Sequence, residues 1–169
     1  MRSAKLKNLT KTALMVAVIA VLAQIVIPFS GMPLTLQTFA IAFCGYFLGM
    51  KLGIAAVLTY LLAGAIGLPV FAGFGATASL IGPTGGFLLG FLPLVFFCGT
   101  AKEKIRRFSF LFSTLGLVIC HLFGVAWYIV TMKTEPLPAW LLVSLPYLPK
   151  DILSLFLAKF FASRLQKCG

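Results

Sequence analysis

The chain is organised around one glycine-rich stretch, Gly67-Leu-Pro-Val-Phe-Ala-Gly-Phe-Gly-Ala-Thr-Ala-Ser-Leu-Ile-Gly-Pro-Thr-Gly-Gly86, which lies between two apolar segments. The window from Gly64 to Gly90 holds eight of the sixteen glycines, and no charged residue occurs between Lys51 and Lys102. Glycine lets the backbone approach other atoms closely, and proline ends a regular helix. The stretch therefore predicts either irregular backbone that covers a pocket at membrane depth or near its edge, or a loop that only reverses the chain.

The composition is that of an integral membrane protein. Hydrophobic residues make up 61% of the chain and charged residues 10%, whereas about 25% of the residues of a soluble domain are charged. A bilayer crossing takes about 20 apolar residues, so the length allows about six crossings and no separate soluble domain. We expect an all-α, polytopic fold in which residues 1–169 form a single transmembrane domain.

Apolar segments define the expected helices. We draw them over residues 12–28, 35–50, 52–66, 83–100, 108–131 and 149–165. Residues 67–82 are expected to add short helical or re-entrant pieces.

The basic residues set the orientation. The net charge of +11 comes from Lys and Arg at the ends of apolar runs. This placement is typical of residues that set the orientation of membrane helices, and not of a surface that binds nucleic acid. With the N-terminus in the cytoplasm, only Lys133 and Lys150 fall on the outer side, so both termini are expected to be cytoplasmic. The glycine-rich stretch, the turn at 29–34 and the connection at 132–149 then share the outer face. We expect a multi-pass membrane protein.

Small residues form one face of the first helix. Ala13, Ala17, Ala20 and Gln24 follow one another at spacings of four, three and four. Such a face lets helices approach closely, and Gln24 should face protein rather than lipid. The pattern fits packing within the bundle or docking of another protein.

Polar residues open the second apolar segment. Thr35, Gln37 and Thr38 follow a turn with two prolines. They either satisfy free N–H groups at a helix start or line the mouth of a pocket. Gln caps helices poorly, which makes Gln37 the better pocket candidate.

A few ionisable and aromatic residues are candidates for ligand contact. Asp151, the only aspartate, starts the last apolar segment beside Lys150, where it either complements the helix dipole or contacts a ligand. His121 lies in the middle of the fifth segment and is either hydrogen-bonded to a neighbouring helix or has a proton or ligand role. Tyr128 belongs either to an interfacial aromatic belt or to the pocket.

The inventory of reactive groups argues against an enzyme. The chain has one His, one Asp and no Ser-His or Cys-His constellation, and Cys44, Cys98, Cys120 and Cys168 show no metal-binding spacing. We expect no catalytic residue, metal or cofactor here. Because no GxxxxGK[ST] motif occurs, uphill transport would need ATP hydrolysis by another subunit, or a coupled ion.

Four motifs follow one another along most of the chain. They are Ile27-Pro with Pro33-Leu-Thr-Leu-Gln-Thr-Phe39, Tyr60-Leu-Leu-Ala-Gly-Ala-Ile-Gly-Leu-Pro-Val-Phe-Ala-Gly73, Gly82-Pro-Thr-Gly-Gly-Phe-Leu-Leu-Gly-Phe91, and a Pro-x-Asp that ends at Asp151. Together they resemble the BioY family, the biotin-specific substrate-binding (S) components of energy-coupling factor (ECF) transporters. The resemblance implies a six-helix, multi-pass protein of the bacterial inner (cell) membrane that captures biotin from outside and delivers it inward. It also implies a complex with a transmembrane coupling protein and two ATPase subunits, which would hydrolyse the ATP.

The resemblance also assigns residues. The family usually carries Asp-x-x-Lys in the last helix, but Ser154 occupies the Lys position here. Three alternatives follow from this difference. Lys150 takes the place of that Lys, the Ser154 hydroxyl donates a weak hydrogen bond to the ligand, or the affinity for the ligand is lower. The expected substrate-binding residues are Thr35, Gln37, Phe71, Gly73, Gly75, Thr84, Gly85, Gly86, Tyr128, Lys150, Asp151 and Ser154, and the expected docking residues are Ala13, Ala17 and Ala20.

Asp151 is expected to accept hydrogen bonds from the ureido N–H groups of biotin, while Gln37, Thr35 or backbone amides of the glycine-rich stretch bind another polar end. That stretch would be the lid and one wall of the site, so that Gly73→Val or Gly85→Val abolishes ligand capture. Two alternatives stay open: an S component for another vitamin, and a membrane enzyme or assembly factor without a transported ligand. Membrane lipid is an expected partner in every case.

Overall fold

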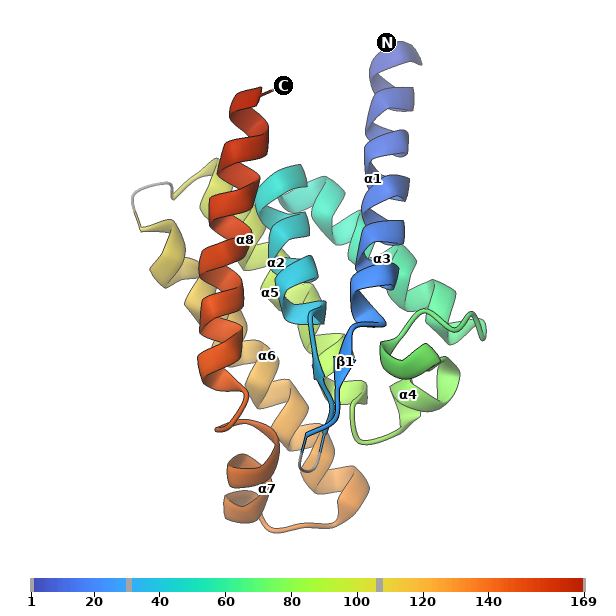
Figure 1. Ribbon diagram of the computed structural model, residues 1–169, viewed down its shortest axis with the longest axis vertical. Helices are drawn as coiled ribbons and strands as arrows, with labels where there is room; N and C mark the ends of the chain where they lie inside the picture. Colours follow the sequence, from blue (N-terminus) through green and yellow to red (C-terminus); the bar gives the residue numbers. More distant parts are fainter. Residues whose placement is uncertain (1, 30–31, 106–107, 169) are drawn as a thin grey trace.

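A computed structural model describes residues 2–29, 32–105 and 108–168. It is a bundle of helices whose two termini lie at the same end (Figure 1). The long elements are α1 (Arg2–Ala23), α2 (Gln37–Leu48), α3 (Met50–Ala65), α5 (Gly85–Glu103), α6 (Ser109–Met132) and α8 (Leu148–Cys168). The short ones are β1 (Val26–Ile27), β2 (Leu34–Thr35), the 3-10 turn η1 (Ala72–Phe74), α4 (Thr77–Ile81) and α7 (Pro136–Val143).

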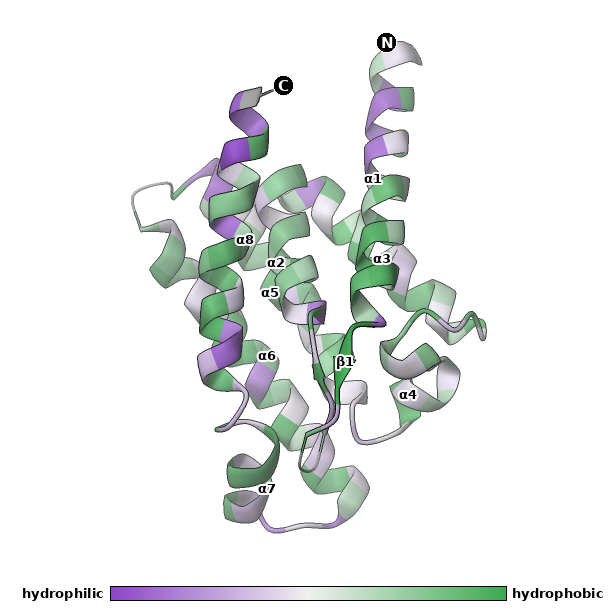
Figure 2. Cartoon of the chain, viewed as in Figure 1, coloured by the Kyte–Doolittle hydropathy of each residue, from purple (hydrophilic) through white to green (hydrophobic). Residues whose placement is uncertain are grey.

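The helices are apolar enough for a membrane. In the described part of the chain, α1, α5 and α6 are each long and apolar enough to cross a bilayer, and α7 with α8 forms a fourth candidate that is bent by 48°. Helices α2 and α3 are apolar but shorter. Hydrophobic residues cover most of the bundle, and hydrophilic ones gather at the ends of α1 and α8 where the chain begins and ends (Figure 2). The all-α fold class is therefore confirmed.

The first helix ends earlier than expected. It stops at Ala23 instead of continuing to residue 28, and β1 pairs antiparallel with β2, with Val26 opposite Thr35. The ring of Pro28 disfavours helical backbone at the residue before it, and β-branched Val and Ile favour extended chain. Thr35 is consequently part of a strand and does not open the second helix. Residues 30 and 31 of the expected turn lie outside the described residues.

The glycine-rich stretch folds into η1 and α4, as short helical pieces were expected to do there. Gly67 and Gly73 have positive φ angles of 96° and 62°, which glycine adopts without the steric cost that a Cβ brings. Gln24, which follows α1, holds the stretch in place, since its Nε2 donates to the Phe71 carbonyl at 3.1 Å and its Oε1 accepts from the Phe74 amide at 2.8 Å. The expectation that Gln24 faces protein is confirmed.

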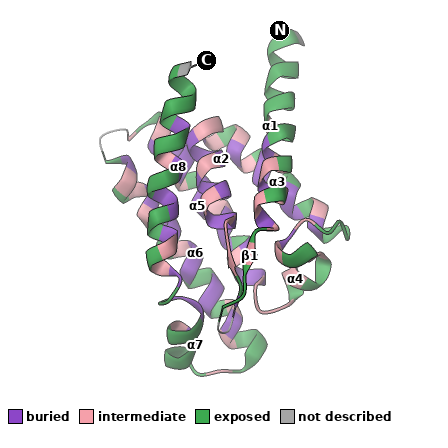
Figure 3. Ribbon diagram, viewed as in Figure 1, coloured by how far each residue is buried: buried purple, intermediate pink, exposed green. Residues whose placement is uncertain are grey.

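Helices α5 and α6 pack closely through glycine. A Cβ atom at Gly90 would lie 2.9 Å from the Cα and carbonyl oxygen of Cys120, and one at Gly116 would lie 2.7 Å from Cβ of Phe97. Contacts this short leave no room for a side chain, so small residues set the distance between the two helices. The buried residues of the bundle lie mainly on α2, α5 and α6, whereas most of α8 is exposed (Figure 3). This packing fixes the starts of α5 and α8, which border the cavity described next.

Candidate functional site

A cavity opens in the half of the bundle away from the termini. Its volume is about 170 Å³. The wall consists of Met32, Pro33, Thr35, Gln37, Thr38, Phe71, Ala72, Ser79, Thr84, Phe87, Leu88, Phe91, Leu117, Cys120, His121, Val143, Tyr147, Lys150 and Asp151. Most of these side chains are apolar or aromatic, and the charged ones, Lys150 and Asp151, are neighbours near the start of α8.

Asp151 is a buried charged residue of the cavity wall. It lies in the first turn of α8 and is buried, with 5% of its surface exposed. Nζ of Lys150 is 2.5 Å from its Oδ1, and Nε2 of His121 is 3.3 Å from its Oδ2. A buried carboxylate keeps its charge only with such partners. The last helix therefore presents a paired negative charge to the cavity.

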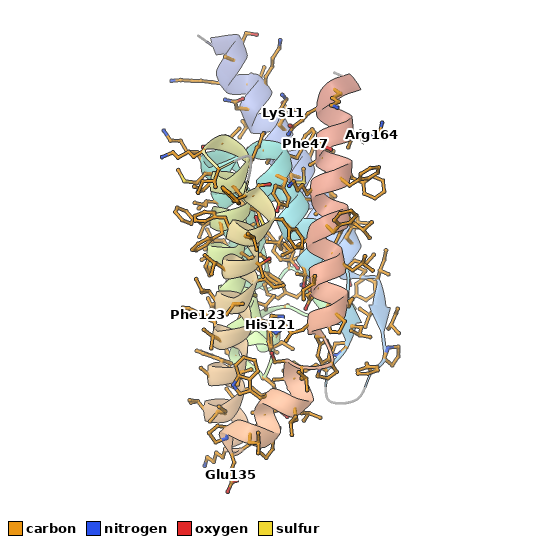
Figure 4. All side chains as sticks on the ribbon, turned by 90° about the vertical axis from the view of Figure 1, so that its left-hand side faces the viewer. Lys11, Phe47, His121, Phe123, Glu135 and Arg164 are labelled. Atoms are coloured by element: carbon orange, nitrogen blue, oxygen red, sulfur yellow. The ribbon has the colours of Figure 1, made fainter. Side chains whose placement is uncertain are left out.

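His121 connects Asp151 to a further residue. Its Nδ1 lies 2.9 Å from Oγ of Ser144, which follows α7 and is fully buried. A carboxylate next to Nε2 favours the proton on that nitrogen, so Nδ1 accepts a hydrogen bond from the Ser144 hydroxyl. His121 thus contacts a neighbouring helix and also borders the cavity, in the middle of α6 (Figure 4).

Ser144, His121 and Asp151 lie far apart in the sequence, but His121 contacts both of the others in space, and such a contact has no motif in the sequence. Ser144 is fully buried and is not part of the cavity wall. A molecule in the cavity therefore does not reach its hydroxyl, as a nucleophile would require. The arrangement orients the carboxylate.

Lys150 joins the last helix to the hairpin. Besides Asp151, its Nζ donates a hydrogen bond to the carbonyl oxygen of Thr35 at 3.0 Å. Tyr147 makes a similar link, because its hydroxyl donates to the Met32 carbonyl oxygen and accepts from the Met32 amide at 3.1 Å. Tyr147 and Lys150 thus hold the β1–β2 hairpin, whose Met32, Pro33 and Thr35 line the cavity.

Gln37 is held by its own set of hydrogen bonds. Its Nε2 donates to the Tyr60 hydroxyl at 2.9 Å, and its Oε1 accepts from the Thr35 hydroxyl at 3.0 Å. The Tyr60 hydroxyl in turn donates to the Val70 carbonyl oxygen at 3.1 Å. Its ring packs edge-on against the ring of Phe71, with the two ring centroids 5.2 Å apart. The amide of Gln37 is therefore presented to the cavity in a fixed orientation.

The structure brings half of the expected ligand-contacting residues to the cavity. Those on the wall are Thr35, Gln37, Phe71, Thr84, Lys150 and Asp151. Those outside the wall are Gly73, Gly75, Gly85, Gly86, Tyr128 and Ser154. The glycine-rich stretch does form one wall, through Phe71, Ala72, Ser79 and Thr84.

The residues outside the wall have other surroundings. Gly85 and Gly86 pack against Trp127, and Tyr128 belongs to a small apolar cluster with Ala139 and Val143. Ser154 is buried one helical turn beyond Asp151. A glycine at a helix start and a tyrosine near a boundary fit a pocket or ordinary packing equally well, so the sequence does not separate these outcomes.

Several wall residues were not predicted. Phe87, whose ring packs edge-on against His121 with ring centroids 5.7 Å apart, lies inside an ordinary apolar run. His121 carried a signal, because an ionisable group in the middle of a membrane helix is costly. The apolar wall residues carried none, since they differ in no way from buried packing residues.

The cysteines and the first helix complete the site inventory. Cys44, Cys98 and Cys120 are buried free thiols, as expected. Within the described residues, no group of three or more His, Cys, Asp or Glu side chains could hold a metal ion. On α1, Ala13 and Ala17 are exposed while Ile19 is fully buried, so the alanine face points away from the core.

Comparison with known proteins agrees with this geometry. The sequence model described as "BioY family" matches residues 1–168. A protein of Pyrococcus horikoshii named probable biotin transporter BioY is 39% identical over 163 residues, which cover 96% of this chain and 98% of that protein. The biotin transporter BioY of Thermotoga maritima is 37% identical over 166 residues, 96% of this chain and 97% of that protein.

A solved structure is similar over the whole fold. It is a crystal structure of the S-component for biotin from an ECF-type ABC transporter, with a TM-score of 0.88 and 30% sequence identity. The alignment covers 100% of this chain and 95% of that chain. The chain therefore belongs to the BioY family.

Proposed function

We propose that this membrane protein is the biotin-binding S component of an ECF-type transporter and takes part in biotin uptake. The observation that carries the proposal is the buried Asp151 carboxylate, held between Lys150 and His121 at the edge of an otherwise mostly apolar cavity. Relatives named as biotin transporters, and a similar structure described as an S-component for biotin, support it.

The cavity suits the chemistry of biotin. The vitamin has an apolar bicyclic body, a ureido group with two N–H donors, and a carboxylate tail. Asp151 accepts from the ureido N–H groups, because a carboxylate attracts these donors and repels the tail. Gln37, Thr35 or backbone amides of the glycine-rich stretch contact the other polar end.

The topology is part of the proposal. Six crossings place both termini in the cytoplasm and the cavity toward the outer face of the bacterial inner membrane, as the distribution of Lys and Arg favours. Helices α2 and α3 are short for a crossing, but most of α2 is buried among the other helices. Exposed apolar side chains of the glycine-rich stretch, such as Leu68, Phe74 and Ile81, support its contact with lipid.

The proposed partners follow from the S-component role. A transmembrane coupling protein and two ATPase subunits provide the energy, since the chain has no nucleotide-binding motif. The exposed alanine face of α1, formed by Ala13, Ala17 and in part Ala20, supports docking of the coupling protein.

Thermal unfolding of the purified protein in detergent tests the function. Biotin should raise the unfolding temperature, because a ligand at about 100 times its Kd stabilises the folded state by about 2.7 kcal/mol. Riboflavin and thiamine should have no effect. A shift with another vitamin would assign a different ligand, and no shift with any vitamin would contradict the transport role.

Lys150 and Ser154 are two candidates for the second polar contact, and the structure favours Lys150. Lys150→Ala removes the cation beside Asp151 and the link to Thr35, so biotin affinity should fall at least about tenfold, which corresponds to about 1.4 kcal/mol. Ser154→Ala should change it less than about threefold, because Ser154 is not on the cavity wall. Titration of each purified variant with biotin measures both, and the reverse order would assign the contact to Ser154.

A further inference from the structure

A second cavity lies at the opposite end of the bundle, where the two termini are. Its volume is about 370 Å³, and it is bordered by α2, α5, α6 and α8. It shares no wall residue with the first cavity. Phe47 and Arg164, which follow the wall residues Tyr46 and Ser163, lie near this end of the bundle in Figure 4, whereas His121 of the first cavity lies far below them.

The wall of this second cavity carries three cations and no acidic residue. Lys102 comes from the end of α5, and Lys159 and Lys167 come from α8, where they are two helical turns apart on one face. In the described part of the chain, neither Lys159 nor Lys167 pairs with a carboxylate. Three like charges in a concave surface repel one another and attract an anion.

A buried hydroxyl points to the same kind of ligand. Ser109, the first residue of α6, lines this cavity with only 3% of its surface exposed. Its Oγ has no hydrogen-bond partner among the described residues. Buried hydroxyl groups are normally hydrogen-bonded, because a buried polar group without a partner is unfavourable. The N-terminus of the 24-residue helix α6 adds partial positive charge at this point.

Part of the cluster has a structural role. Nζ of Lys102 donates to the Phe47 carbonyl oxygen at 2.6 Å, and Nε2 of Gln166 donates to the Tyr46 carbonyl oxygen at 3.0 Å. These bonds satisfy carbonyl groups at the end of α2. They do not account for Lys159, Lys167 or Ser109.

We propose that this second cavity binds a phosphate group, held by Lys159, Lys167 and the Ser109 hydroxyl. The phosphate belongs either to the head group of an anionic lipid or to a free phosphate ion. Its surroundings suit a lipid, because Phe160, Phe161 and Leu165 are exposed on the same part of α8 and can contact acyl chains. Basic pockets between membrane helices on the cytoplasmic side are a known setting for lipid head groups. The inference does not depend on biotin binding.

Native mass spectrometry of the whole protein, released from nanodiscs of equal parts phosphatidylglycerol and phosphatidylcholine, tests the proposal. Retained lipid should be enriched in phosphatidylglycerol by at least about fivefold, following the gain expected from several charges near a membrane surface. Lys159→Gln combined with Lys167→Gln should remove the enrichment, and Ser109→Ala should reduce it. Arg164→Gln is the matched control: it removes one cation from the same helix, outside the cavity wall, and should retain the enrichment.

A second arm separates the two sources of phosphate. Inorganic phosphate is added to the detergent-purified protein, and its effect on thermal unfolding is compared between the wild type and the double lysine variant. Stabilisation of the wild type alone, without lipid enrichment, would support a site for the free ion. Unchanged biotin binding in every variant shows that the proteins are folded.

Two results would overturn the proposal. One is equal phosphatidylglycerol retention by the wild type and the double variant, together with no phosphate effect. The other is unchanged lipid retention with loss of binding to the coupling protein, which would assign the lysines to an acidic segment of that partner.

Discussion

Asp151→Asn is expected to lower biotin affinity at least about 100-fold. The substitution keeps the size of the side chain but removes the negative charge that Lys150 and His121 hold at the cavity. A hydrogen bond to a charged group contributes about 1.5–3 kcal/mol, and two ureido N–H groups lose one each. A tenfold change corresponds to about 1.4 kcal/mol, so the combined loss exceeds two orders of magnitude. Titration of the purified variant with biotin measures it.

The control for this prediction is Glu135→Gln, which makes the same chemical change at an exposed position outside the cavity wall. It should leave biotin affinity unchanged. Asp151→Ala should lose affinity at least as strongly as Asp151→Asn. If either Asp151 variant bound biotin as tightly as the wild type while remaining folded, the assignment of the ureido contact would be wrong.

Gly85→Val is expected to weaken biotin binding at least about tenfold. A Cβ at Gly85 would overlap the carbonyl oxygen of Leu80, which belongs to the backbone and cannot rotate away. The segment that carries Ser79 and Thr84 to the cavity wall must then shift, and the hydrogen bond between them, 3.0 Å long, is disturbed. Overpacking of this kind also costs about 1–3 kcal/mol of stability. Thermal unfolding with and without biotin separates the two effects.

Two comparison variants sharpen this prediction. Ala78→Val adds bulk at an exposed position of the same segment and should bind biotin normally. Gly73→Val places a side chain in open space but at a φ of 62°, a strain of about 1–2 kcal/mol, so its effect should be smaller than that of Gly85→Val. Normal binding by Gly85→Val would reduce the glycine-rich stretch to a connector.

The long helices could be predicted from the sequence because their apolar runs are long. Helices α5 and α6 begin and end within about three residues of the expected bounds. The end of α1 could not be placed as well, because the apolar run continues without a break from α1 through the strand β1 to Pro28. Two-residue strands leave no periodic signal, and α7 lies in a segment that was predicted only as a connection.

The polar residues of the site could be predicted from the sequence, because burying a polar side chain in a membrane protein is unfavourable. Asp151, Lys150 and Gln37 could be identified because polar groups within apolar segments need a reason to be there. The contacts of His121 with Asp151 and Ser144 depend on how α6, α8 and the segment after α7 pack together, which cannot be read from one sequence. The glycines at 85 and 86 were assigned to the ligand because close approach to a ligand and close approach to a neighbouring helix require the same residue.

Equilibrium binding of radiolabelled biotin to the purified wild-type chain, without any other transporter subunit, tests the central claim most directly. The account predicts saturable binding of one biotin per chain that unlabelled biotin displaces and riboflavin does not. It also predicts that the Asp151→Asn variant shows no saturable binding at the same concentrations. Absence of saturable binding by the wild type, or displacement by riboflavin as readily as by biotin, would contradict it.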